Sequence, residues 1–366
     1  MAGDGISLTQ RLDGTTERKL HAKVVDNILN APAYLSRLMA MGKPFEGKSQ
    51  DFTVDVSNST QFEWFTGLEN LNASAENTTI TLTYYHTAGT QPKVSIMLES
   101  FANAGQTGTI PLDAFLYEKA AQEAIRNVAT AAYSTGTGDR PLGLQAIVDD
   151  GTNKATIGGQ TRSAYDPLDC AAHTDSGGTM TLAKLGVLDD ACSASGVVNA
   201  TPNINDTTKT VWSLYEQLLQ PQARASYNEI GYKMLPQIGD RIVTAGNLKG
   251  AAGFTALQHR GAPLIKDDFA TTGVWYKLNE RSFGWYGRSI VPDEYKGLVT
   301  KVNLGSMEAY ESRATENTLS EFNGWFYQKP MMMPDQAGTI ARFYVIGQMM
   351  TWEPRRNGQL HDITGV

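Results

Sequence analysis

The chain has 366 residues, of which 41% are hydrophobic and 19% are charged, and its formal net charge is −7. At roughly 100–200 residues per domain, this length allows two or three domains. The apolar fraction is large enough for a packed core, which excludes an intrinsically disordered polymer. The negative net charge argues against a protein whose main task is to bind nucleic acid, because such proteins are usually basic.

The two cysteines, Cys170 and Cys192, lie far apart in the sequence. This spacing favours free, partly buried thiols over a disulfide or a metal site. The first residues contain no apolar segment of a secretory signal, and no stretch approaches the roughly 18 apolar residues of a membrane helix. We therefore expect a soluble protein that is made inside the cell and has no membrane partner.

Residues 15–41 have the spacing of an amphipathic helix that Pro32 interrupts. Such a segment is not stable alone and needs a surface to lie on, so it is interpreted as an arm. Its apolar stripe consists of Leu20, Val24, Val25, Ile28 and Leu29, followed after the proline by Tyr34, Leu35, Leu38 and Met39.

Residues 49–101 alternate between apolar and polar side chains, which predicts strands. The first two strands would form a long hairpin with one apolar face. Two-stranded hairpins are marginal alone in water, so either this chain's own body or another subunit must cover that face. The alternating apolar positions are Phe52, Val54 and Val56, then Ile80, Leu82 and Tyr84, then Val94, Ile96 and Leu98.

The polar stretch between the first two of these strands carries Phe62, Trp64 and Phe65. These side chains could fold back on their own domain. They could equally anchor a neighbouring subunit, because aromatic residues are enriched at the centres of interfaces. The sequence leaves both readings open.

Residues 111–133 give the clearest helix of the chain. Pro111 suits the first helical position and Asp113 suits the N-terminal end of the helix dipole. Leu116, Ile125 and Val128 lie on its expected core face. At 1.5 Å per residue, this helix would be roughly 35 Å long.

The rest of the chain mixes both kinds of element. Residues 140–178 are irregular, a second helix begins near Leu182, and a third is capped by Thr207 or Thr208. Residues 241–290 read as strands and turns, and residues 339–353 are apolar enough for a central strand with both faces covered. This order, without an internal repeat, predicts the α+β fold class.

The segment from Gly42 to Ser49 matches the phosphate-loop pattern G-x-x-x-x-G-K-S. The chemistry of that loop requires a strand before it and a helix after it. Here a helical pattern precedes the match and a strand pattern follows it, and Glu46 would place a negative charge beside the phosphate. We therefore interpret the segment as a connecting loop.

No other pattern indicates catalysis, a metal or a cofactor. The five histidines lack the spacing of a zinc site, and there is no nucleophile elbow. The acidic pairs at 149–150, 189–190 and 267–268 are more typical of solvated turns than of metal sites. We predict a protein that is not an enzyme and has no catalytic or metal-ligating residues.

The order of these elements resembles the major capsid protein family of tailed bacteriophages, which has the Hong Kong 97 fold. The resemblance covers nearly the whole chain, but no single motif is diagnostic. The stretches that carry it are PKVSIMLESF at 92–101, the helix at 111–132, GTGDRPLGL at 136–144, GGQTRSAY at 158–165, VWSLYEQLLQP at 211–221, GAPLIKDD at 261–268, GVWYKLN at 273–279 and the closing FYVIGQMMTWEPRRNGQLHDI.

The resemblance implies a division of the chain into the parts of that fold. The expected parts are an N-terminal arm at 1–47, an extended β-hairpin loop at 48–91, a peripheral domain at 92–177 with its spine helix at 111–133, an axial domain at 178–300, and peripheral return strands with a C-terminal tail at 301–366.

The function it implies is a major capsid protein that assembles into the pentamers and hexamers of an icosahedral head around double-stranded DNA. Its main partner would be other copies of itself. Further partners would be a portal protein, a separate scaffolding protein if one is used, and optional decoration proteins. The packaged DNA would be contacted weakly and without sequence preference. The location would be the virion, assembled in the host cytoplasm. The expected subunit-interface residues are Leu20, Val24, Ile28, Phe62, Trp64, Phe65 and Tyr84.

Two alternatives remain. One is an encapsulin-like compartment, which would have the same fold and an enclosed cargo. The other, ranked far behind, is a nucleotide-using enzyme built on the loop from Gly42 to Ser49.

Overall fold

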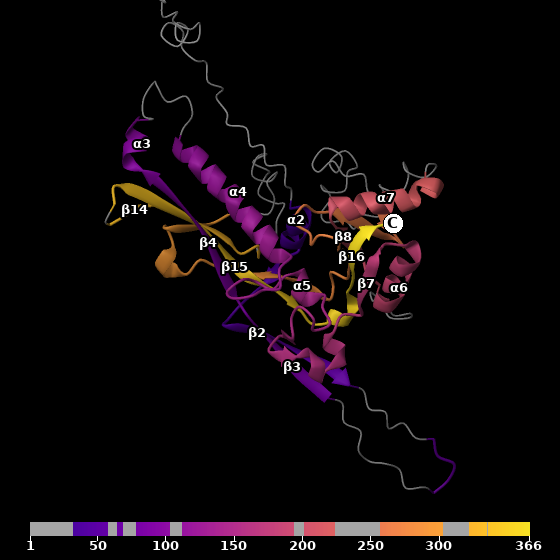
Figure 1. The fold of residues 1–366 in the computed structure, drawn as a ribbon. Helices are drawn as coiled ribbons and strands as arrows, with labels where there is room; N and C mark the ends of the chain where they lie inside the picture. The colour runs from indigo at the N-terminus through magenta and orange to yellow at the C-terminus, as the bar shows by residue number, and fades with distance from the viewer. Residues whose placement is uncertain are drawn as a thin grey trace, which may run out of the picture.

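The computed structural model describes residues 32–57, 64–68, 78–102, 112–193, 201–223, 257–302, 322–334 and 336–366. Helices and strands are mixed along the chain, which confirms the predicted α+β class. In Figure 1 one sheet runs under the long helix α4, a second sheet lies beside α6 and α7, and the β2–β3 hairpin extends from the lower end. None of the described helices is long and apolar enough to cross a membrane.

The first sheet has six strands that come from both halves of the chain. Its long strand β15 lies between β14 and β4 along one part and pairs with β12 along the other. The strands are β1 (Lys43–Pro44), β12 (Phe283–Gly287), β15 (Gly338–Thr351), β14 (Trp325–Met332), β13 (Val299–Lys301) and β4 (Thr87–Ile96).

The pairing of β4 with β15 is antiparallel and extends over ten residue pairs, from Ile96 opposite Gly338 to Thr87 opposite Gly347. Helix α4 (Leu112–Ala132) packs against both strands. The short helix α3 (Met97–Ala102) follows β4 directly. This strand pair is therefore the platform on which α4 lies (Figure 1).

The second sheet also has six strands and combines parallel with antiparallel pairs. Helices α6 (Leu182–Cys192) and α7 (Lys209–Ala223) pack against it. Thr181 and Thr208 accept hydrogen bonds from amides at the starts of these helices, so Thr208 is the cap predicted for the third helix. The strands are β7 (Ala172–Thr179), β16 (Gly358–Gly365), β11 (Trp275–Leu278), β8 (Ile204–Thr207), β10 (Ala262–Lys266) and β9 (Leu257–His259).

Smaller elements complete the described part. Strands β2 (Ser49–Ser57) and β3 (Thr78–Tyr85) form the predicted hairpin, and β5 and β6 form a short one beside it. The remaining elements are α2 (Ala33–Ala40), α5 (Leu144–Ile147), β5 (Thr156–Ile157), β6 (Gln160–Thr161), η1 (Arg162–Ala164), η2 (Asp166–Leu168), η3 (Asp293–Tyr295) and η4 (Pro354–Arg356).

The structure corrects one expectation for residues 92–101 and shows which strand pairs with this segment. Leu98 belongs to helix α3 and not to a strand. The strand before it, β4, pairs with β15 from the far end of the chain and not with the β2–β3 hairpin. The alternation of apolar and polar residues predicts a strand but does not show which other strand it pairs with.

Sheet membership also crosses two of the expected domain boundaries. Strand β12 lies within 178–300 but pairs in the first sheet, and β16 lies within 301–366 but pairs in the second. The chain thus passes between the sheets more often than a simple succession of domains would require.

Helix α2 belongs to the region expected to be an arm, and it packs on the chain's own core. Tyr34, Leu35, Leu38 and Met39 are all buried there. Nε and Nη2 of Arg37 each donate a hydrogen bond of 2.6 Å to a different carboxylate oxygen of Glu280. Residues 33–40 are therefore fixed to the body, and residues 1–31 of the predicted arm lie outside the described residues.

The N-terminus of α2 is capped by a residue 233 positions away in sequence. Pro32 provides no side-chain cap, and the amide of Tyr34 donates to Oδ2 of Asp267 at 2.8 Å. The other carboxylate oxygen of Asp267 accepts from the amide of Phe269. Asp267 therefore satisfies an amide that the helix cannot satisfy itself, and its charge suits the positive end of the helix dipole.

A second buried carboxyl, Asp206, accepts a hydrogen bond of 2.6 Å from the hydroxyl of Tyr133 at the end of α4. Burial, together with the charge of Asp267, raises the pKa of Asp206. Burial also raises the pKa of Asp267, to about 6. Helices α2 and α4 thus meet the second sheet at two acidic side chains that are costly to ionise.

Replacing Asp267 with alanine should lower the free energy of unfolding by about 1–2 kcal/mol, the usual cost of losing a helix cap. Asp267→Asn retains one oxygen acceptor and should cost less. Chemical denaturation at pH 7 measures both variants. Equal stability of wild type and Asp267→Ala would contradict the capping role.

The pKa of Asp267 also predicts a pH dependence. Its folded value of about 6 exceeds the ordinary 3.8, so between these values the folded state binds more protons than the unfolded state. The contribution of protonated Asp267 to the stability of the folded state is therefore complete below pH 3.8 and is lost as the pH rises through 6. Relative to Asp267→Asn, wild type should lose on the order of 2 kcal/mol between pH 4 and 7. Parallel stability profiles for the two proteins would contradict this.

Candidate subunit-contact surfaces

The base of the β2–β3 hairpin is packed against the chain's own body. Ile80, Leu82 and Tyr84 of β3 form a buried cluster with residues of the first sheet and of the β5–β6 hairpin. The members of this cluster are Phe45, Ile80, Leu82, Tyr84, Ile157, Leu168, Tyr286 and Met350. The hairpin therefore leaves the body at a fixed place.

Gly158 allows the β5–β6 turn to approach β3 closely. Its φ is +54°, and a Cβ at this position would lie 2.7 Å from Cβ of Leu82. The carbonyl of Gly158 accepts from the amide of Thr83 at 2.9 Å. Glycine suits this position because it tolerates the left-handed conformation and leaves room for Leu82.

A ring stack and a cation also fix the hairpin base. Phe52 of β2 stacks on Trp352, with 5.5 Å between the ring centroids. The ammonium of Lys43 lies 4.2 Å from the ring centroid of Trp352, within the range of a cation–π interaction. Burial lowers the pKa of Lys43.

The structure corrects the placement of Tyr84 at a subunit interface. Its side chain is buried within its own chain, and its hydroxyl donates to the carbonyl of Thr351 at 2.7 Å. Burial raises the pKa of this hydroxyl. The alternation of β3 turns Tyr84 to the same face as Leu82, which the chain's own body covers.

The hairpin tip contrasts with its base. Trp64 is 89% exposed and Phe65 is 60% exposed, and Leu68 is also fully accessible. Figure 1 shows segment 64–68 well away from both sheets. Within the described part of this chain, these three side chains therefore present apolar surface to solvent.

A second exposed apolar surface lies at the opposite end of the first sheet. It is formed by the end of β4, by α3 and by the end of β14, which Figure 1 places together at the upper left. Its large exposed side chains are Val94, Ile96, Met97, Leu98, Phe101, Met331 and Met332. The sequence reading missed this surface, because the alternation of Val94, Ile96 and Leu98 was read only as a strand.

The remaining predicted site residues fall in different places. Leu20, Val24, Ile28 and Phe62 lie outside the described residues. On α4, Ile125 and Val128 are buried in the main core, while Leu116 is partly exposed.

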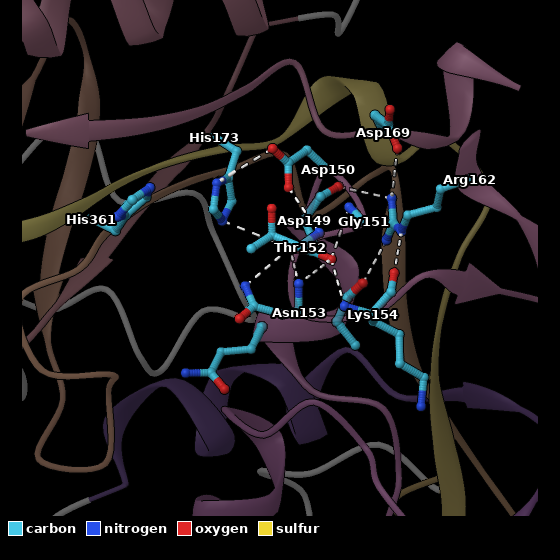
Figure 2. A network of polar contacts seen from close by, with 12 residues as sticks. Asp149, Asp150, Gly151, Thr152, Asn153, Lys154, Arg162, Asp169, His173 and His361 are labelled. Carbon is cyan, nitrogen blue, oxygen red and sulfur yellow. Dashed lines mark hydrogen bonds and ion pairs between the residues drawn. The ribbon is translucent and has the colours of Figure 1, made fainter.

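Arg162 is the largest buried polar group that the sequence reading did not single out. Its guanidinium donates to main-chain carbonyls of Asp149, Lys154 and Ala146, at 2.8, 3.1 and 2.6 Å, and also to that of Leu168. Burial lowers its pKa. Figure 2 shows it pointing into the loop that follows α5, so its role is to organise this irregular region.

Asp149 organises the same loop through its carboxylate. The carboxylate accepts from the amides of Gly151, Asn153 and Lys154 and from the side-chain amide of Asn153. His173 lies within 3.7 Å of Asp149 and 3.6 Å of Asp150, and its ring contacts His361 (Figure 2). The donors that hold Asp149 already occupy its oxygens, which gives it a structural role.

The segment from Gly42 to Ser49 follows helix α2 and precedes strand β2, with only the two-residue strand β1 between. This is the order predicted from the sequence and the reverse of a phosphate loop. Lys48 is exposed on this connection.

No family model and no curated protein sequence matches this chain. Solved structures do match it along nearly its whole length. The capsid asymmetric unit of cyanophage A-1(L) aligns with a TM-score of 0.67 and 14% identity, covering 95% of this chain and 97% of that one. The capsid of a native GTA particle aligns with a TM-score of 0.56 and 12% identity, covering 98% and 99%.

An encapsulin complex from Synechococcus elongatus PCC 7942 aligns with a TM-score of 0.55 and 10% identity, covering 98% of this chain and 96% of that one. Identities this low compare folds and not activities. The chain therefore has the fold of phage major capsid proteins, which it shares with an encapsulin.

Proposed function

We propose that this protein is a major capsid protein that assembles into the pentamers and hexamers of an icosahedral phage head around double-stranded DNA. The observation that carries the proposal is the hairpin, whose base is buried in its own chain and whose tip exposes Trp64 and Phe65. The match to capsid structures over both full lengths supports it.

In the Hong Kong 97 fold, we assign residues 1–47 to the arm, 48–91 to the extended loop, 92–177 and 301–366 to the peripheral domain, and 178–300 to the axial domain. The position of α4 along the first sheet supports a spine helix. Strand β12 comes from the proposed axial domain but pairs in the first sheet, and β16 comes from the proposed peripheral domain but pairs in the second. This exchange of strands supports two domains that are closely joined.

The proposed role is structural and not enzymatic. The phosphate-loop match lies between the wrong elements, and the buried charged groups Arg162 and Asp149 are bonded to main-chain atoms. The net charge of −7 suits a shell that contacts packaged DNA weakly and without sequence preference. Further partners would be a portal, a separate scaffolding protein and, as an option, decoration proteins, with assembly in the host cytoplasm.

An encapsulin-like compartment is the second candidate, because an encapsulin aligns nearly as well as the GTA capsid does. The contents of purified particles distinguish the two. Packaged nucleic acid supports the phage head, and a co-purifying cargo enzyme supports the compartment.

The purified protein should sediment as capsomers or as large closed particles, because the apolar tip and sheet end are exposed in one copy. Analytical ultracentrifugation with negative-stain microscopy measures this. A stable monomer at high concentration in every condition tried would contradict the proposal.

Trp64→Ala should reduce the yield of particles by about tenfold or more, because truncating a central interface aromatic costs about 2 kcal/mol or more. It should leave the melting temperature of the unassembled subunit unchanged. Leu82→Ala is the matched control in the same hairpin, because Leu82 is buried at the base and its loss should destabilise the subunit by about 2–5 kcal/mol. Normal assembly of Trp64→Ala would contradict a contact role for the tip.

A further inference from the structure

A cleft of about 580 Å³ opens at the base of the hairpin. Three chain segments form it: the connection from β3 to β4, the loop that follows α4, and the β5–β6 hairpin. The cleft lies apart from the hairpin tip and from the apolar end of the first sheet, so it is not part of the surfaces already described.

The charged side chains that line the cleft are mostly cationic. Arg140 and Lys154 line it, against the single acid Asp139. Arg140 is exposed, and no carboxylate in the described part of the chain forms an ion pair with it. Lys154 donates one hydrogen bond, to the carbonyl of Gly136 at 3.0 Å, and an ammonium has three donors.

Part of the remaining lining is apolar or hydrogen-bonded within the chain. Leu142 and Ile157 contribute apolar surface. The amide of Gln348 is engaged at both ends, because its oxygen accepts from Leu142 and its nitrogen donates to the carbonyl of Tyr85. The Arg140 guanidinium and the remaining donors of Lys154 thus share the cleft with apolar side chains. This combination suits a ligand with a carboxylate beside apolar side chains.

The same chain exposes a segment with this chemistry. The turn at residues 290–298, between β12 and β13, carries Glu294 among the exposed side chains of Ile290, Tyr295 and Leu298. Glu294 is itself exposed. The neighbouring acid, Asp293, is already paired with Lys296 within the turn, which leaves Glu294 as the carboxylate presented by this segment.

The turn has a fixed shape before it meets any partner. The amide of Tyr295 donates to Pro292, and that of Leu298 donates to Tyr295, at 2.9 and 3.1 Å. Lys329 of β14 holds the end of the turn by donating its amide to the carbonyl of Leu298. A preformed segment loses little conformational entropy on docking.

The turn and the cleft do not meet within one copy, because no residue of the turn lines the cleft. The turn leads into β13, which pairs with β14, while the cleft is lined by residues at the base of the β2–β3 hairpin. Two different surfaces that complement each other produce a head-to-tail contact, which closes into a ring when the rotation allows.

We propose that Glu294, on the 290–298 turn of one copy, binds Arg140 in the cleft of the next copy. This inference rests on the proposed function, since it requires copies to assemble. It goes further by assigning one directional contact, which is distinct from the hairpin tip, and the residue pair that fixes it.

The test is a charge swap, read as the yield of particles at low ionic strength. Arg140→Glu and Glu294→Arg each place like charges in the contact and should reduce the yield by about tenfold or more. The double variant restores opposite charges and should recover the yield to within about twofold of wild type. Arg355→Glu, which reverses another exposed arginine outside the cleft, is the matched control and should assemble normally.

Thermal melts of the unassembled variants show whether each subunit remains folded. If wild type assembles and Arg140→Glu assembles as well as Arg355→Glu, the inference is overturned and the proposed function stands. Failure of the double variant to recover also overturns it, whether or not the single variants assemble. Absence of particles from wild type itself overturns the proposed function.

Discussion

The antiparallel pairing of β4 with β15 is the constraint on which the rest of the molecule depends. It joins a strand near the beginning of the chain to one near its end over ten residue pairs. Helix α4 lies on this pair, the β2–β3 hairpin leaves from one end of it, and α3 with the end of β14 lies at the other. The base of the hairpin and the apolar end of the first sheet are therefore held at fixed positions by one long strand ladder.

The base and the tip of the hairpin differ in burial. Its base buries Leu82 and Tyr84 against the body, and its tip leaves Trp64 and Phe65 in solvent. A hairpin with both ends exposed would be only marginally stable, and one with both ends buried would offer nothing to a neighbour. Division of the apolar surface along its length is what a shell subunit requires.

Local sequence patterns predicted much of this fold. The alternation in β2 and β3 and the periodicity of α4 set the elements almost to their ends, and the order of elements alone excluded a phosphate loop at 42–49. These features depend on neighbours within a few residues. They can therefore be read without knowing what the chain packs against.

Apart from helix α3, the features that the sequence did not predict depend on distant partners. Tyr84 looked like a contact residue because its alternation does not say which molecule covers that face. The cap from Asp267 to α2 spans 233 residues, and the buried Arg162 binds carbonyls that become neighbours only after folding. The turn at residues 290–298 and the cleft were also not predicted. Opposite charges on two separate surfaces produce no periodic pattern in the sequence.

The most direct test of the account is a cryo-electron microscopy reconstruction of particles assembled from this protein alone. The account predicts closed icosahedral shells in which residues 64–68 lie against a neighbouring subunit while Leu82 and Tyr84 remain packed in their own chain. A reconstruction in which the tip folds back onto its own body would contradict it.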